Sequence, residues 1–224
     1  MIKQISFFKR KEGISVEDFQ NHWRTVHAEL VVKLPNLLGY VQNHTHASGY
    51  LKHEPDFDGV AEVWFDSTDA MRGNVGSDVL QAIRDDEHNF IDRSSMGTLL
   101  TEEVVIVDGP RPQGGVKSIA FLNKRDDVTP EFFQQHWRTQ HANIASQITE
   151  QLRYVQCHCR LGIYRTGRKP PFDGVPMSWF ASFDDLKASG RSDAFRLTRA
   201  DEPNFMVTGR LPFSVAEELE IVAP

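Results

Sequence analysis

Hydrophobic residues recur with two different periods along the first hundred residues, and these periods predict the secondary structure. Residues 2–9 are rich in β-branched and aromatic side chains, which is typical of a strand, and Gly13 ends the segment. Ser15, followed by acidic residues, has the composition of a helix start. Apolar side chains then recur at helical spacing over about sixteen residues: Phe19, Trp23, Val26 and Leu30.

The remaining elements complete a known arrangement. Two strands are expected around 40–46 and 60–65, a more polar helix near 77–93, and a last strand at 102–107. The corresponding last strand of the second half is expected at 217–222. The order is strand, helix, strand, strand, helix, strand. This is the split βαβ plan of ferredoxin-like domains, in which an antiparallel sheet carries both helices on one face.

The whole pattern occurs twice. HWRTVHA at 22–28 returns as HWRTQHA at 136–142, FDGVAEVWF at 57–65 as FDGVPMSWF at 172–180, and DEHNF at 86–90 as DEPNF at 201–205. Two domains, 1–109 and 116–224, are therefore predicted, separated by a segment rich in Gly and Pro. The predicted fold class is α+β: two fused ferredoxin-like units that pair sheet to sheet as an internal pseudo-dimeric α/β barrel. Whether the full chain self-associates further stays open.

Composition and charge exclude several classes of binding partner. The net charge of −6 and the pI of about 5.8 argue against nucleic-acid binding, which needs a clustered basic face. The apolar run at the start of the chain is short and interrupted by charges, so we expect neither a signal peptide nor a membrane span. We therefore expect a cytoplasmic protein. Cys157 and Cys159 are interpreted as buried free thiols, and no metal site is expected.

Four motifs, each present in both halves, resemble the EthD family of the dimeric α/β-barrel superfamily. They are Phe-x-x-x-Trp-x-x-x-His, Tyr-Val-Gln-x-His, Phe-Asp-Gly-Val followed by Trp-Phe, and Asp-Glu-x-Asn-Phe. The resemblance implies ferredoxin-like subunits paired into a barrel. Related families include cofactor-free monooxygenases, polyketide cyclases, muconolactone isomerases and haem enzymes, so the resemblance implies a fold more firmly than a reaction.

His27 and His141 are the candidate catalytic residues. Each follows a tryptophan, Trp23 or Trp137, by one helical turn, which predicts a position at the rim of the helix–sheet interface. A histidine there could move a proton at neutral pH, or simply bond to backbone. His22 and His136 lie about 140° away on an ideal α-helix, so we interpret them as capping or packing residues.

Further residues are expected to bind substrate. Tyr40 and His44 share one strand face, and so does His158 with its neighbours; this face lines either the pocket or the seam between the halves. Asp58, like Asp173, forms an Asp-Gly turn or orients the helix histidine. The other candidates are acidic or aromatic residues of the third strand in each half: Glu62, Trp64 and Trp179.

These residues predict an enzyme that needs no organic cofactor. The reaction would be an isomerisation, an elimination or a cyclisation, driven by proton transfer through histidine. The substrate would be a small apolar oxygenated molecule, such as an aromatic compound, a lactone or a polyketide-like ring. A non-catalytic small-molecule-binding protein and a haem-binding barrel are the alternatives. Glu62 becomes Met177 and His88 becomes Pro203 in the second half, which predicts one competent site and one degenerate copy, unless these are drifting surface positions.

Overall fold

The computed structural model describes residues 1–224, and the predicted order of elements is present in both halves. The first half contains β1 (Ile2–Arg10), α1 (Val16–His22), η1 (Trp23–His27), α2 (Ala28–Val31), β2 (Leu37–Thr45), η2 (Ala47–Tyr50), β3 (Gly59–Phe65), α3 (Thr68–Arg72), α4 (Asp78–Phe90) and β4 (Ile91–Val107). The second contains β5 (Val116–Ala120), α5 (Pro130–His136), η3 (Trp137–His141), α6 (Ala142–Ala145), β6 (Arg153–Cys159), α7 (Gly162–Arg165), β7 (Gly174–Phe180), α8 (Phe183–Ser189), α9 (Asp193–Asp201), η4 (Glu202–Asn204) and β8 (Phe213–Val222).

The hydrogen-bonded strand order is β1-β3-β2-β8-β5-β7-β6-β4, and it closes on itself as an antiparallel barrel. The α+β fold class predicted from the sequence is therefore confirmed. No helix combines the length and the apolar composition that a membrane span requires.

Two compact units divide the chain. The first unit comprises Met1–Leu100 together with Glu218–Pro224, and the second comprises Thr101–Glu217. Each unit thus includes the end of a strand from the other half, an exchange that the predicted ranges 1–109 and 116–224 do not contain. In the first unit Ile221 and Val222 pack against the core. In the second, residues 101–107 of β4 pair with β6.

One element boundary differs from the prediction. The helix expected near 77–93 ends at Phe90, and β4 begins at Ile91 rather than at residue 102. The polar stretch Asp92–Ser95 concealed this strand, because its side chains are largely exposed and it lacks the apolar alternation that marks a half-buried strand.

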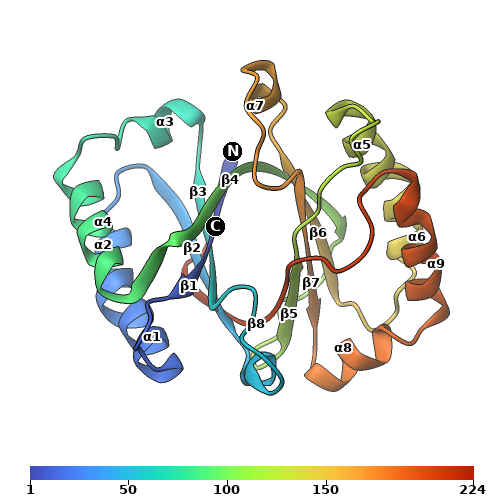
Figure 1. The fold of residues 1–224 in the computed structure, drawn as a ribbon, viewed down its shortest axis with the longest axis horizontal. Helices are drawn as coiled ribbons and strands as arrows, with labels where there is room; N and C mark the ends of the chain where they lie inside the picture. The colour runs from blue at the N-terminus through green and yellow to red at the C-terminus, as the bar shows by residue number, and fades with distance from the viewer. The chain divides into compact units, whose positions relative to one another are not determined.

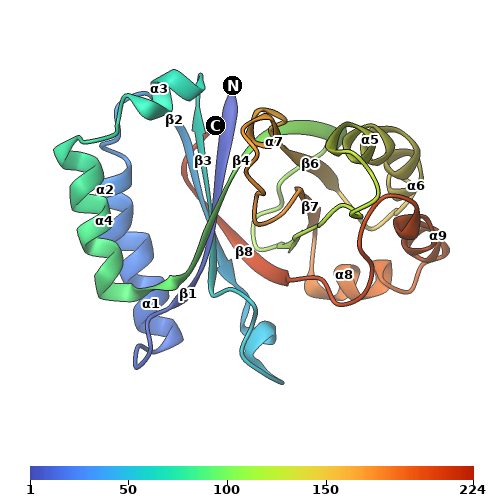
Figure 2. The same ribbon diagram turned by 45° about the horizontal axis from the view of Figure 1, so that its top comes forward.

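The helices of each unit cover one face of that unit's sheet. Figure 1 shows α1, α2 and α4 on one face of β1, β2 and β3, and Figure 2 shows the same layering from a second direction. Aromatic rings fill this layer: Trp23 lies 5.0 Å from Phe8 and 5.8 Å from Phe19, centroid to centroid. The approach is close, since a Cβ at Gly59 would lie 2.6 Å from the Trp23 ring. The helix–sheet layer therefore holds Trp23, and with it the following turn, in a fixed place.

Candidate functional site

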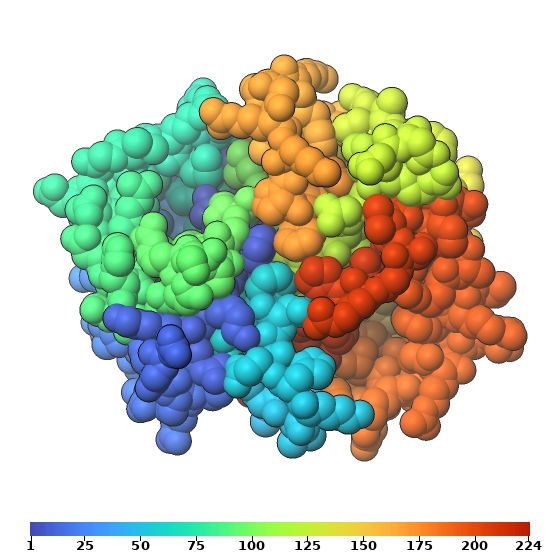
Figure 3. Space-filling view, in the orientation of Figure 1, coloured from blue at the N-terminus to red at the C-terminus, as the bar shows by residue number.

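Each unit contains one cavity between its helices and its sheet. The cavity of the first unit has a volume of about 460 Å³, and that of the second about 360 Å³. His27, Trp23 and Tyr40 line the first, and their repeat equivalents His141, Trp137 and Tyr154 line the second. In Figure 3 the surface of the first unit is hollowed between the segment around α3 and the segment around α4 and β4. His27 thus lies at the helix–sheet interface, and of the two positions left open for Tyr40, pocket or seam, the structure has the pocket.

A π-helical turn interrupts the first long helix of each unit. Ser15 caps the helix by accepting a hydrogen bond from the Asp18 backbone N–H, and α1 runs to His22. In η1 the Ala28 N–H then bonds to the carbonyl of Trp23, five residues earlier. Bonds from i to i+5 widen the turn, so residues five apart come to the same side of the helix. Because of this turn, His22 and His27 face the same neighbour.

That neighbour is Asp86 of α4, whose carboxylate joins both histidines. His22 Nε2 lies 2.8 Å from Asp86 Oδ1, and His27 Nδ1 lies 2.8 Å from Asp86 Oδ2. In the second unit His136 Nε2 and His141 Nδ1 each lie 3.0 Å from an oxygen of Asp201. His22 and His136 do pack on Phe90 and Phe205, as one of the two expected roles has it. Their expected separation from His27 and His141 was wrong, because it assumed an uninterrupted α-helix.

The Asp-Glu-x-Asn-Phe motif builds the other side of this arrangement. Asn89 donates a hydrogen bond of 3.2 Å to Asp86 Oδ1, and Asn204 donates one of 2.9 Å to Asp201 Oδ1. The Phe90 ring packs on both histidines, 4.8 Å from His22 and 4.9 Å from His27. Two of the motifs that both halves share therefore form a single cluster.

The cluster fixes the proton positions on His27. An ionised carboxylate only accepts hydrogen bonds, so Nδ1 of His27 carries the proton that points to Asp86, and Nε2 of the neutral ring keeps a lone pair. Burial lowers the pKa of His27 below 6.5, although the hydrogen bond that His27 donates to Asp86 opposes this. For Asp86, burial disfavours the ionised form, but the hydrogen bonds from His27 and His22 outweigh it and lower the pKa. At neutral pH the arrangement is therefore a neutral imidazole beside an ionised carboxylate.

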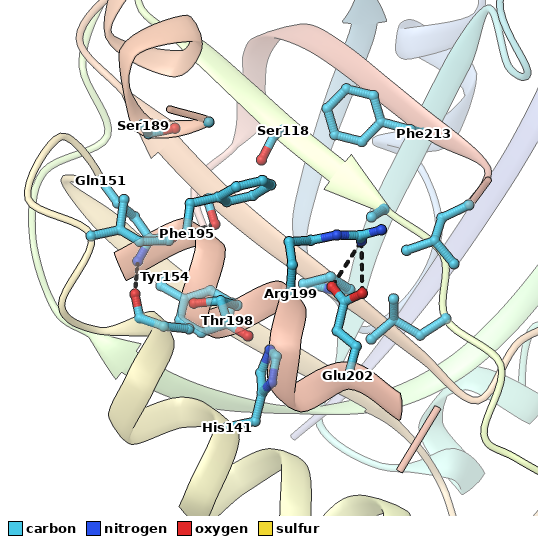
Figure 4. A pocket seen from close by; sticks show the side chains of 18 of the residues that line it. Ser118, His141, Gln151, Tyr154, Ser189, Phe195, Thr198, Arg199, Glu202 and Phe213 are labelled. Atoms are coloured by element: carbon cyan, nitrogen blue, oxygen red, sulfur yellow. Dashed lines mark hydrogen bonds and ion pairs between the residues drawn. The ribbon is translucent and has the colours of Figure 1, made fainter. Parts of the chain in front are cut away.

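Nε2 of His27 makes no hydrogen bond to the protein, and the side chain is 6% exposed in the cavity wall. His141 is equivalent: it is also 6% exposed, and its pKa is lowered by burial. In Figure 4 His141 points from its helix toward the cavity, with Tyr154 and Glu202 around it. An acceptor atom on a neutral, oriented imidazole is the feature that a general base requires.

Tyr40 belongs to a second hydrogen-bonded group on the same sheet face. Its hydroxyl accepts from Trp23 Nε1 at 3.0 Å and from Gln42 Nε2 at 2.8 Å. Gln42 also donates to the Trp23 carbonyl at 2.8 Å and accepts from His44 Nε2 at 2.8 Å. His44 packs against the Trp23 ring, with the two rings tilted by 47°, and does not line the cavity. Its role is thus to hold Gln42, and His158 repeats it in the second unit.

An ion pair lines each cavity opposite the aromatic residues. Glu87 pairs with Arg93 in the first unit, and Glu202 pairs with Arg199 at 2.8 Å in the second (Figure 4). Burial raises the pKa of both carboxyl groups. The glutamate comes from the same motif position in both halves, whereas its arginine comes from β4 in one and α9 in the other. A buried glutamate paired with a partly exposed arginine is therefore common to both cavities.

Several predicted site residues lie elsewhere. Glu62 and Trp64 are on the opposite face of β3, where Glu62 pairs with Lys3 and accepts from Asn43, and the Lys3 ammonium lies 4.7 Å from the Trp64 ring. Trp179 is also on the face away from the helices and stacks with Lys117 at 4.4 Å. These three residues line neither cavity, because their side chains lie on the sheet face that points away from the helices.

Asp58 and Asp173 do not orient the histidines. Asp58 accepts hydrogen bonds from the Arg10 guanidinium, from the Arg10 backbone N–H and from the Tyr50 hydroxyl. Asp173 likewise accepts from the Lys124 backbone N–H and the Tyr164 hydroxyl. Asp58 and Asp173 thus hold the chain at the Asp-Gly segment and do not contact His27 or His141. The carboxylates that orient those histidines are Asp86 and Asp201.

The proposed asymmetry between halves loses its basis. It rested on Glu62, which faces away from the cavity, and on His88, an exposed residue of α4 that bonds only to a backbone carbonyl. The residues around the cavities are instead matched between halves, down to the histidine, carboxylate, tyrosine and glutamate. Sequence reasoning recorded the Asp-Glu-x-Asn-Phe repeat but assigned its residues no role, and the repeat itself was the available signal.

Comparison with known proteins identifies the family. The EthD domain profile matches residues 11–94 and again residues 125–209, which is more than half of the chain. The chain therefore belongs to the EthD family and contains two EthD domains. No curated protein matches the sequence significantly.

Solved structures share the barrel at low sequence identity. An anthrone oxidase-like protein superimposes with a TM-score of 0.65 at 8% identity, covering 98% of this chain and 93% of its own. A variant chlorite dismutase from Candidatus Nitrospira defluvii has a TM-score of 0.53 at 9% identity, with 96% and 91% coverage. An EthD family protein from Bacillus halodurans C-125 is 24% identical over 46% of this chain and 99% of its own, with a TM-score of 0.38.

Proposed function

We propose that each half of the chain is an acid–base catalyst that acts on a small, largely apolar oxygenated molecule without an organic cofactor. The observation that carries this proposal is the histidine–aspartate pair at each cavity, in which Nδ1 is held by a carboxylate and Nε2 is open to the cavity. Both halves keep it, so we propose two working sites rather than one.

The cavities suit a small ring compound. Their volumes of about 460 and 360 Å³ lie toward the lower end of the range of about 300–1,000 Å³ found for small-molecule sites. Aromatic and aliphatic side chains dominate the walls. In the second cavity the charged groups are matched, since Arg199 is the single arginine of its lining and it is paired with Glu202. The second lining therefore favours an uncharged ligand, whereas in the first cavity Arg72 and Arg84 add positive charge beside the Glu87–Arg93 pair.

The chemistry follows from the protonation states. His27 Nε2 takes a proton from a carbon or hydroxyl acid, and the bond's electron pair stays on the substrate as an enolate or phenolate. The imidazolium that forms is stabilised by the Asp86 carboxylate on Nδ1. Return of the proton to another carbon gives an isomer. Transfer of the proton to a leaving oxygen, as the electron pair forms a C=C bond and the C–O bond breaks, gives an elimination product. Attack of the enolate carbon on a second carbonyl carbon, whose oxygen then takes the proton, gives a cyclised product, and none of these outcomes needs an oxidant or a reductant.

Haem binding was the alternative implied by the family resemblance, and the second cavity does not fit it well. Haem propionates need cations that are free to pair with them, and the arginine in that lining is already neutralised by Glu202. A haem titration tests this view: a Soret band that disappears in His141→Ala would contradict it.

Hydrogen–deuterium exchange tests the proposal directly. The full chain is incubated in D₂O with a panel of cyclic ketones, lactones, phenols and anthrone, and loss of substrate C–H signals is followed by proton NMR. Anthrone is included because one structural neighbour is described as anthrone oxidase-like, and oxygen uptake is recorded in parallel.

We expect the wild-type chain to accelerate exchange for at least one class, and His27→Ala with His141→Ala to lose about a hundredfold to ten-thousandfold of that rate. Exchange that survives the double substitution would contradict the mechanism. Binding of panel members without exchange would favour the non-catalytic binding protein.

A further inference from the structure

The direction of the hydrogen bonds around Tyr40 is fixed by two groups that have only one role. The Trp23 indole N–H can only donate, so the Tyr40 oxygen accepts from it. The Trp23 carbonyl can only accept, so the Gln42 amide presents its nitrogen, not its oxygen, on that side. The amide orientation therefore does not depend on how the two amide atoms were assigned.

The remaining bonds follow in sequence. With its nitrogen toward Trp23, Gln42 also donates to the Tyr40 oxygen, and its own oxygen faces His44. His44 Nε2 must then carry a proton. Both lone pairs of the Tyr40 oxygen are thus occupied, and its O–H makes no hydrogen bond to any atom of the protein. A buried hydroxyl proton without an acceptor is costly unless something else receives it.

The second unit repeats this result independently. The Tyr154 oxygen accepts from Trp137 Nε1 and from Gln156 Nε2, each at 3.2 Å, and its O–H has no protein acceptor. Gln156 donates to the Trp137 carbonyl and accepts from His158. Burial raises the pKa of Tyr154 to about 12, so the hydroxyl stays protonated across the physiological range. Both tyrosines line their cavities together with the histidine base.

We propose that Tyr40 and Tyr154 each donate a hydrogen bond to an acceptor oxygen of the substrate, and that the substrate is therefore a carbonyl compound with an acidic C–H beside the carbonyl. This inference rests on the proposed function, since it supplies the partner of the histidine base. His27 Nε2 removes the C–H proton, the electron pair forms a C=C bond, and the carbonyl electrons move to the oxygen held by Tyr40. Gln42 and His44 are positioning residues that act through the tyrosine.

A matched pair of ligands tests the oxygen contact by binding alone. The probes are 2-tetralone and tetralin, which differ by the carbonyl group, and dissociation constants are measured by NMR titration of the full chain. The test variant is Tyr40→Phe with Tyr154→Phe. The control variant is Tyr50→Phe with Tyr164→Phe, because those hydroxyls bond to Asp58 and Asp173 and line neither cavity described above.

We expect the wild-type and control proteins to bind 2-tetralone about threefold to tenfold more tightly than tetralin, which corresponds to one neutral hydrogen bond. The test variant should lose that preference and bind tetralin unchanged. A preference that survives in the test variant, equal binding of both probes by the wild-type chain, or no binding of either would overturn the proposal.

The same titration separates this inference from the proposed function. His27→Ala with His141→Ala removes the base and leaves the tyrosines in place, so the ketone preference should persist. If exchange is absent in wild-type protein while the preference depends on Tyr40 and Tyr154, the oxygen contact stands and the catalytic role of histidine fails. If exchange depends on histidine but the preference does not depend on tyrosine, the reverse holds.

Discussion

Replacing Asp86 by asparagine isolates the contribution of the carboxylate that joins His22 and His27. Asparagine has nearly the same shape, but it offers one acceptor oxygen and one donor nitrogen in place of two acceptor oxygens. Since both histidines donate to Asp86 at 2.8 Å, asparagine can accept from only one of them. If its nitrogen faces His27, the ring must accept at Nδ1 and carry its proton on Nε2, which cannot then act as a base.

The magnitudes follow from these contacts. A hydrogen bond to a charged group contributes about 1.5–3 kcal/mol, and Asp86→Asn removes at least one of the two. For a chain of this size we expect the melting temperature to fall by about 3–12 °C. The wrong tautomer should reduce exchange by up to the full effect of a missing base, about a hundredfold to ten-thousandfold. The pKa of His27, already lowered by burial, should fall further, because Asp86 raises it in the native protein.

Three measurements on the same protein check this reasoning: thermal unfolding by circular dichroism, deuterium exchange into the best panel substrate, and NMR titration of the His27 ring proton. Asp85→Asn is the matched control, since Asp85 is the adjacent residue of α4, is exposed, and accepts only from Gln81. The control should change the free energy of unfolding by less than about 0.5 kcal/mol. An Asp86→Asn protein with native exchange rates and an unshifted His27 titration would refute the assigned role.

Three other outcomes are expected. His27→Ala and His141→Ala should each remove the exchange due to one cavity; a chain that keeps full exchange after losing His141 would restore the idea of one degenerate half. Gly59→Ala should destabilise the first unit by about 1–3 kcal/mol in denaturant unfolding, because the new Cβ would lie 2.6 Å from the Trp23 ring, and an unchanged stability would mean that this layer repacks freely. Burial lowers the pKa of His44 from 6.5 to about 3, and that of His158 equally. Since the folded-state pKa is depressed, the associated stability is present above pH 6.5 and is lost as pH falls toward 3. His44→Gln with His158→Gln should flatten this slope, and a slope that keeps its native steepness would contradict the assignment.

The fold could be predicted from the sequence because its signals are periodic and repeated. The helical recurrence of Phe19 and Trp23, the strand-like composition of residues 2–9 and the duplicate of each motif all pointed to one answer. Strand faces were harder to assign. The alternation along β3 says that Glu62 and Trp64 share a face, but the choice of face depends on packing that a single strand does not encode.

The histidine–aspartate cluster could not be predicted, for a geometric reason. A helical wheel advances by about 100° per residue, and five such steps place His22 and His27 on different sides. The π-helical turn brings residues five apart to the same side of the helix, and no residue type in HWRTVHA predicts such a turn. The partner carboxylate also lies about sixty residues away on another helix, so its distance from the histidines depends on the tertiary fold.

The π-helical turn and the oriented tyrosine depend on the same side chain. Widening the helix at η1 gives up the α-helical bond that the Trp23 carbonyl would otherwise accept, and leaves that carbonyl with the Ala28 N–H of the wider turn. Gln42 adds a second bond to this carbonyl, and its other amide hydrogen fixes the Tyr40 oxygen. One amide thus bonds the carbonyl at the turn that brings His27 to Asp86 and also occupies a lone pair of the Tyr40 oxygen. Both halves keep this glutamine, so in each half one amide bonds both the carbonyl at the π-helical turn and the tyrosine oxygen.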